Sequence, residues 1–102
     1  MEIKGQRMAD QLILYLSGEL DESTAAYSRN AIEAFCENGG FSSVIYDVSN
    51  LTFMDSTGIG VLIGRYKKLK DRKIKVFVKN PGRNVDRIFA MAGLYEIMPK
   101  IG

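Results

Sequence analysis

The chain has 102 residues, with 14 Lys and Arg against 12 Asp and Glu, a size that suits a single domain over residues 1–102 and is too small for two. It contains no histidine, which excludes a Ser-His-Asp triad, a Cys-His pair, histidine-ligated zinc and a phosphohistidine relay. Its one cysteine, Cys36, has no partner for an internal disulfide and is expected to be a buried apolar residue. No leader pattern or bilayer-length apolar run is present, so we expect a cytoplasmic protein with no membrane partner.

The charges are distributed unevenly along the chain. Residues 1–51 hold 3 Lys and Arg against 8 Asp and Glu, whereas residues 52–102 hold 11 against 4. This polarity suits a protein partner with a surface of mixed sign. The basic run over residues 65–73 contains one aromatic residue, Tyr66, on the apolar side of a predicted helix, so a solvated helix flank is favoured over direct nucleic-acid binding.

The first predicted elements form a β-hairpin, with strands over residues 3–8 and 11–17 joined by Ala9-Asp10. Residues 11–16 are almost continuously apolar, a pattern typical of a strand covered on both faces. Residues 18–21 then interrupt the strand pattern.

A helix is predicted next, capped by Asp21 or Ser23 and running to about residue 38, where Gly39-Gly40 ends it. Its inward-facing residues are expected to be Ile32, Phe35 and Cys36. A strand over residues 43–48 and a loop over residues 50–55 follow.

The second helix is predicted to start near Ser56, because residues 59, 62, 63, 66 and 69 form one apolar helical face. A strand over residues 74–78 follows, and Asn80-Pro81 is typical of a helix start. Gly93 ends that third helix, and a last short strand is predicted over residues 95–98. The resulting order, ββαβαβα(β), predicts an α/β fold with a mostly parallel mixed sheet, an antiparallel N-terminal hairpin at its edge and three to four helices.

The most informative stretch is residues 51–60. Ser56 lies where a loop becomes a helix, and the simplest interpretation makes Ser56 and Thr57 capping residues. Three glycines in the same helix, Gly58, Gly60 and Gly64, each cost about 1 kcal/mol relative to alanine, which indicates that something approaches this helix closely. Packing explains Gly60 and Gly64, four residues apart, and access to Ser56 explains Gly58.

A small nucleotide-binding domain is the alternative that these glycines raise. Residues 58–64 read G-x-G-x-x-x-G, one residue away from the dinucleotide fingerprint. The strand that follows ends without a carboxylate for a ribose, and no Gly-Lys-Ser/Thr occurs. The sequence therefore predicts no cofactor and no metal.

Beyond these inferences, the chain resembles the single-domain anti-sigma factor antagonists of the STAS family (sulfate transporter and anti-sigma factor antagonist). Three segments carry the resemblance: Leu16-Ser17-Gly18-Glu19-Leu20-Asp21, Phe53-Met54-Asp55-Ser56-Thr57-Gly58-Ile59-Gly60 with Gly64-Arg65-Tyr66-Lys67, and Val85-Asp86-Arg87-Ile88-Phe89 with Ala92-Gly93-Leu94. They occur in the family's order over nearly the whole chain. The Gly-Arg-Tyr-Lys continuation is similar to the sporulation-type antagonists.

The resemblance implies a non-enzymatic switch protein. Its unphosphorylated form would bind an anti-sigma factor that is a serine kinase and so release the sigma factor; phosphorylation at Ser56, or alternatively at Thr57, would end the complex, and a serine phosphatase would restore it. The residues implied at the partner surface are Glu19, Leu20, Asp21, Asp55, Ser56, Thr57, Gly58, Ile59 and Gly60.

Two other STAS roles remain as alternatives, a scaffold module of the stressosome type and an isolated domain of an anion transporter. The first would lack a kinase switch. A monomer is expected, because no exposed apolar stripe is evident in the sequence.

Overall fold

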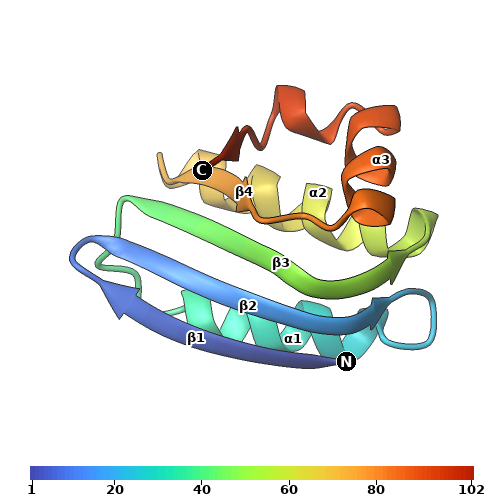
Figure 1. Cartoon of the computed structure of the whole chain (residues 1–102). Coiled ribbons are helices and arrows are strands. Elements are labelled where there is room, and N and C mark those ends of the chain that lie inside the picture. Colours follow the sequence, from blue (N-terminus) through green and yellow to red (C-terminus); the bar gives the residue numbers. More distant parts are fainter.

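A computed structural model describes residues 1–102 as a five-stranded sheet with helices packed against it (Figure 1). The strands are β1 (Glu2–Met8), β2 (Gln11–Leu20), β3 (Ser43–Met54), β4 (Lys75–Lys79) and β5 (Lys100–Ile101), and they lie in that order across the sheet. The helices are α1 (Ala25–Cys36), α2 (Ser56–Asp71), α3 (Arg83–Met91) and the short 3-10 helix η1 (Leu94–Glu96). β1 pairs with β2 antiparallel and the other pairs are parallel, which confirms the predicted fold class and element order.

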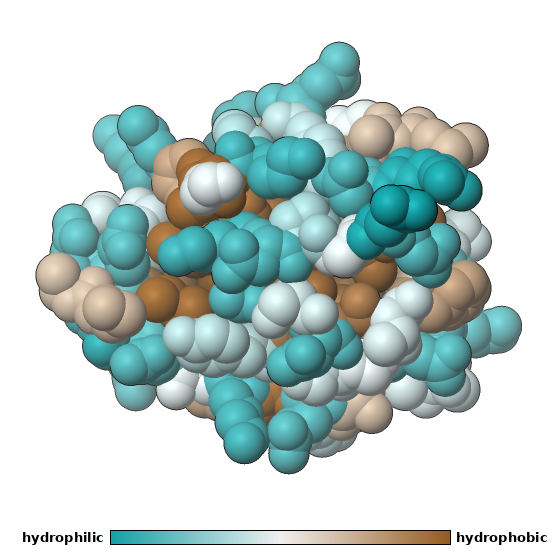
Figure 2. Space-filling model, in the orientation of Figure 1, coloured by the Kyte–Doolittle hydropathy of each residue, from teal (hydrophilic) through white to brown (hydrophobic).

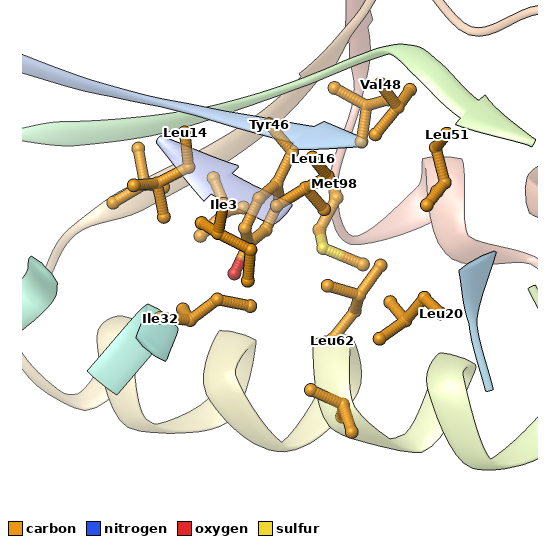
Figure 3. Packing of buried hydrophobic residues seen from close by; sticks show 14 of the residues in the cluster. Ile3, Leu14, Leu16, Leu20, Ile32, Tyr46, Val48, Leu51, Leu62 and Met98 are labelled. Carbon is orange, nitrogen blue, oxygen red and sulfur yellow. The ribbon is translucent and has the colours of Figure 1, made fainter. Parts of the chain in front are cut away.

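The helices α1 and α2 pack on one face of the sheet, where α1 contacts β1 and β2 and α2 contacts β3 and β4 (Figure 1). α3 contacts β3 and lies beyond the end of β4. Alternate residues of the central strands point toward the helices and are buried. Figure 3 shows this core, in which Leu14 and Tyr46 from the sheet face Ile32 of α1 and Leu62 of α2.

The opposite face of the sheet has no helix over it, so the prediction that residues 11–16 form a strand covered on both faces is wrong. Ile13 and Tyr15 are half-exposed there, and the Tyr15 hydroxyl donates to Gln6 Oε1 at 2.9 Å. An apolar run in a central strand indicates burial, but the sequence does not show that the second layer of helices is absent.

Cys36 is buried at the end of α1 as predicted, and burial raises the pKa of its thiol, with Arg65 and Arg72 opposing the rise. Phe35, predicted to face inward, is 39% exposed. Its ring covers Gly5 of β1, where a Cβ would lie 2.6 Å from two ring carbons. Phe35 therefore fits against the edge strand because residue 5 has no side chain.

Several element boundaries differ from the prediction. β2 runs to Leu20, through residues 18–20 that were expected to interrupt it, and α1 spans Ala25–Cys36 with Thr24 before it, so neither Asp21 nor Ser23 is its N-cap. β3 runs six residues further, to Met54, where a loop over residues 50–55 was expected, because its end pairs with the end of β2. α3 begins at Arg83 after Gly82, and Asn80 has φ 58°, so Asn80-Pro81 does not start the helix. The last strand is β5, since residues 94–96 form η1 after the left-handed Gly93. No helix is long and apolar enough to cross a membrane.

Candidate functional site

The candidate site lies where β2 and β3 end side by side. Because these strands are parallel neighbours, Leu20 pairs with Met54, and the loops that follow emerge at the same edge of the sheet. The Asp55 amide donates to the Leu20 carbonyl at 3.3 Å. Such strand ends are the usual location of sites in open α/β sheets. The structure therefore brings residues 19–21 beside Ser56, as expected from the sequence.

Asp55 is the residue that caps α2. Its Oδ1 accepts a hydrogen bond from the Gly58 amide at 2.9 Å, and its Oδ2 accepts one from the Glu22 amide at 3.1 Å. One carboxylate thus satisfies a free amide of the helix N-terminus and ties the β2–α1 loop to α2. The capping interpretation of Ser56 is wrong: Ser56 is the exposed first residue of the helix, and its hydroxyl forms no hydrogen bond within the chain.

The three glycines of α2 have roles opposite to those predicted. A Cβ on Gly58 would overlap the carbonyl oxygen of Leu20, so α2 approaches the end of β2 only because residue 58 is glycine. Gly60 and Gly64 are exposed, and a Cβ added at either would have no neighbouring atom within 4 Å. Packing therefore explains Gly58, and it does not explain Gly60 or Gly64.

Asp21 shapes the loop between β2 and α1. Its Oδ1 accepts from the Ser23 hydroxyl at 2.7 Å and from the Ser23 and Thr24 amides at 3.0 and 3.1 Å. The Ser23 hydroxyl is the largest cause holding the pKa of Asp21 below its ordinary value, with the backbone bonds adding to it. Asp21 closes this turn; the helix itself starts at Ala25, after Thr24, with no side-chain cap.

A shallow depression of about 500 Å³ opens beside Asp55. Three of its lining residues, Glu22, Ser23 and Phe53, were not among those expected from the sequence. Phe53 is 40% exposed although it belongs to β3, because no element covers that side of the strand end. The signal available in the sequence was an aromatic residue directly before the Met54-Asp55 strand end, on the side opposite the buried Met54.

The nine residues expected at the partner surface differ in their burial. Glu19, Ser56, Thr57 and Gly60 are exposed, Asp21, Asp55 and Ile59 are half-buried, and Leu20 and Gly58 are buried. The Leu20 side chain is fully buried, and Leu20 contributes to this part of the structure through its backbone carbonyl. The exposed Ser56 hydroxyl follows Asp55, and Asp55 lines the neighbouring depression together with the carboxylate-bearing residues Asp21 and Glu22.

The basic run over residues 65–73 does not form one continuous patch. The Arg65 side chain is buried against α1, with Nη2 3.4 Å from Glu33 Oε2. Arg72 donates to the Cys36 carbonyl at 3.1 Å. Two of the cations therefore hold α2 against α1, and no group of three or more His, Cys, Asp or Glu side chains is arranged to hold a metal ion.

Comparison with known proteins places this chain in a family. The model of the STAS domain family matches residues 1–102. The chain is 33% identical over 99 residues to the anti-sigma F factor antagonist of Paenibacillus polymyxa, covering 97% of this chain and 85% of that protein. It is 32% identical over 98 residues to the anti-sigma-B factor antagonist of Listeria monocytogenes, covering 96% and 84%.

A solved structure gives the same result. The anti-sigma factor antagonist SpoIIAA in its unphosphorylated form superposes with a TM-score of 0.80 at 25% identity, covering 99% of this chain and 89% of that one. The chain therefore belongs to the STAS domain family and, within it, to the anti-sigma factor antagonists. Proteins of this class are regulatory and not enzymes.

Proposed function

We propose that the chain, in its unphosphorylated form, binds an anti-sigma factor that is also a serine kinase and thereby releases a sigma factor. Transfer of phosphate from Mg-ATP to Ser56 ends this complex, and a separate serine phosphatase restores the binding form. Family membership supports the anti-sigma factor as the partner. The switch is supported by SpoIIAA, which is known in an unphosphorylated and a phosphorylated form.

The observation that carries the proposal is that the helix α2 is capped by Asp55 and not by Ser56. Asp55 caps α2, so the Ser56 hydroxyl is exposed and free of hydrogen bonds within the chain. A kinase can reach this oxygen without unfolding the protein, and phosphorylation of Ser56 breaks no hydrogen bond within the chain. Thr57 is exposed as well and is the second candidate acceptor.

The local charges explain why a phosphate would end binding. A phosphoserine carries about −1.5 to −2 charges at neutral pH. At residue 56 that charge is tolerated by the positive end of the α2 dipole. In an interface it would have to be desolvated beside the carboxylates of Asp55, Asp21 and Glu22, which is costly. The switch therefore acts on the surface and leaves the fold in place.

The test is intact-mass spectrometry after incubation with an anti-sigma factor kinase and Mg-ATP. The wild-type chain is expected to gain one phosphate, Ser56→Ala none, and the matched control Thr57→Ala one. Phosphate retained on Ser56→Ala and lost from Thr57→Ala would show that Thr57 is the phosphorylated residue. A folded wild-type chain that binds the kinase and is never phosphorylated would instead support the scaffold alternative.

Within the antagonists we propose the sporulation type, on the resemblance of residues 64–67 to those proteins. The two kinds of relative are almost equally similar, at 33% and 32% identity. Arg65 is buried and Tyr66 half-buried, so they act by setting how α2 packs. Calorimetric titration of the chain with a purified anti-sigma F factor and with an anti-sigma-B factor distinguishes the two, and tighter binding to the second would reverse the assignment.

A further inference from the structure

The outermost strand, β1, leaves one side of the sheet open. β1 pairs only with β2 at the end of the strand order, and Figure 1 shows no helix or strand beyond it. In the same orientation, Figure 2 shows mainly hydrophilic side chains along this lower edge of the molecule. Residues 4–8 are all exposed. Gly5 has no side chain, so its exposure is exposure of the backbone itself.

The hairpin geometry decides which backbone groups of β1 point outward. Met8 and Gln11 face each other across the two-residue turn, so they are the hydrogen-bonded pair that closes the hairpin. Hydrogen-bonded and non-hydrogen-bonded pairs alternate along an antiparallel ladder. The N–H and C=O groups of Gly5 and Arg7 therefore point away from β2, and neither residue forms a backbone hydrogen bond in a turn, loop or cap.

The features that usually block an open strand edge are absent from β1. The strand contains no proline, and its pairing with β2 runs without a bulge from Glu2 to Met8. Its two cations have partners within the chain: Lys4 Nζ lies 3.9 Å from Glu2 Oε1, and Arg7 Nη2 donates to the Gly40 carbonyl at 2.5 Å. The edge of β1 is therefore open to pairing with another strand.

A second copy of the chain matches this edge in geometry and in charge. Two β1 strands related by a two-fold axis run antiparallel, and the helices of both copies lie on the same face of the joined sheet. An axis at Gln6 pairs Gly5 of each copy with Arg7 of the other, so the outward groups of both residues gain partners. Residues 2–10 carry two acidic and two basic side chains, so the two edges have no net charge and do not repel each other.

Phe35 adds apolar surface beside the same edge. It is 39% exposed, and its ring covers Gly5 on the helix side of the sheet. Gly5 is next to the axis at Gln6, so the two Phe35 rings of a symmetric pair approach each other and lose exposed area. A foreign strand with no helix above it would leave Phe35 exposed, which is the reason for preferring a second copy.

We propose that the chain forms a two-fold symmetric dimer in which β1 pairs with β1 across Gln6 and joins the two five-stranded sheets into one. A monomer is expected from the sequence because no exposed apolar stripe is evident, but an unpaired strand edge consists of backbone and leaves no such stripe. Ser56 belongs to α2, which contacts β3 and β4, whereas β1 contacts β2 and α1. The dimer therefore leaves both Ser56 sites accessible and does not depend on the kinase switch.

Sedimentation equilibrium of the purified chain tests the association. The interface is small, so we expect a mean mass that rises toward two chains between about 10 µM and about 1 mM. Arg7→Pro removes the outward amide without breaking a bond to β2 and should weaken association by about tenfold or more. The matched control Arg7→Ala loses the same side chain, keeps the amide and should stay within about threefold of the wild type. A wild-type chain that is monomeric at about 1 mM, or equal association of the two folded variants, would overturn the proposal.

Disulfide cross-linking tests the register. Gln6 faces its own counterpart as a non-hydrogen-bonded pair with Cα atoms about 4.5 Å apart, within reach of a disulfide. Gln6→Cys should therefore form a covalent dimer under mild oxidation. Lys4→Cys lies on the same face of β1 but about 13 Å from its counterpart, at four residues of offset, and should not. The wild-type chain, whose Cys36 is buried, is the blank. Equal cross-linking of the two variants would indicate random collision and would overturn the pairing across Gln6.

Discussion

At the scale of single residues, alanine substitutions at the three glycines of α2 are expected to change the stability of the protein in opposite directions. Gly58→Ala should destabilise the protein by about 1–3 kcal/mol, because the added methyl meets the Leu20 backbone, which cannot move aside. Gly60→Ala and Gly64→Ala should each stabilise it by up to about 1 kcal/mol, because both positions are open and alanine favours the helix. Urea unfolding curves measure all three, and a stabilised Gly58→Ala would contradict the close contact.

The same residues show what the sequence could not provide. The sequence placed three glycines in one helix and correctly indicated that something approaches it closely. Which glycine makes the contact depends on the distance from α2 to the Leu20 carbonyl, a tertiary quantity. Gly60 and Gly64 remain without an intramolecular reason, which is consistent with a surface that a partner approaches.

Asp55 and Ser56, adjacent in sequence, should respond differently to alanine. Asp55→Ala removes the cap on the Gly58 amide and the bond to Glu22 and should cost about 1–2 kcal/mol. Ser56→Ala removes no hydrogen bond and should change the unfolding free energy by less than about 0.5 kcal/mol. Thermal and urea unfolding of both variants measure the difference. A large loss in Ser56→Ala would mean that its hydroxyl has a structural role after all.

At the scale of elements, α2 ends in a turn that carries strain. The Ile74 amide donates to Leu69 and the Lys73 amide to Lys70, at 2.9 and 2.8 Å, and Lys73 has φ 61° where glycine is usual. Lys73→Gly should therefore stabilise the protein by about 0.5–1 kcal/mol. Urea unfolding measures this effect, and a loss of stability would show that the lysine side chain supports the turn.

Asp86 joins α3, η1 and β5. Its Oδ1 accepts from the Tyr95 hydroxyl at 2.6 Å and from Lys100 Nζ at 2.9 Å, and the Tyr95 bond, followed by the Lys100 bond, lowers the pKa of Asp86. A carboxylate with a lowered folded pKa stabilises the protein above its unfolded pKa, about 4, and this contribution is lost as the pH falls through the folded value. The stability gap between wild type and Asp86→Asn should thus be full above about pH 5 and shrink in more acidic solution. Urea unfolding at several pH values tests this, and a gap that stays constant down to about pH 3 would contradict it.

The element boundaries that the sequence missed have a common cause. Local patterns correctly predicted the hairpin, the start of α2 at Ser56 and the stop at Gly93. They failed at the end of β3, where Asn50 and Thr52 look like loop residues but belong to the strand that pairs with β2, and at the chain's last strand. In both places the pairing partner is distant in sequence, and pairing overrides local propensity.

At the scale of the whole molecule, the sequence correctly predicted the topology and the position of the site but missed the open face of the sheet. Strand and helix alternation fixes the crossovers, and the crossovers place the ends of β2 and β3 together. Whether the second face of the sheet is covered depends on whether further helices pack against it. Ile13 is half-exposed within a run that looks fully buried. The result is a fold whose two ends are separated by the length of α2, with the Ser56 site at one and the left-handed turn at Lys73 at the other.

The last prediction concerns the whole molecule, namely how phosphorylation at one end affects its stability and its binding. Phosphorylation of Ser56 should leave the unfolding free energy within about 1 kcal/mol of the unmodified value, because the helix dipole favours a charge there by about 0.3–1 kcal/mol while the nearby carboxylates oppose it. The affinity for the anti-sigma factor should fall by about a hundredfold or more, about 2.7 kcal/mol. Urea unfolding and calorimetric titration of the purified phosphorylated chain give the two numbers. If the unfolding free energy and the affinity both fell, phosphorylation would act by destabilising the fold, and the proposal of a switch confined to the surface would be wrong. If the unfolding free energy stayed the same and only the affinity fell, the added charge at the surface around Ser56 would be sufficient to explain the switch.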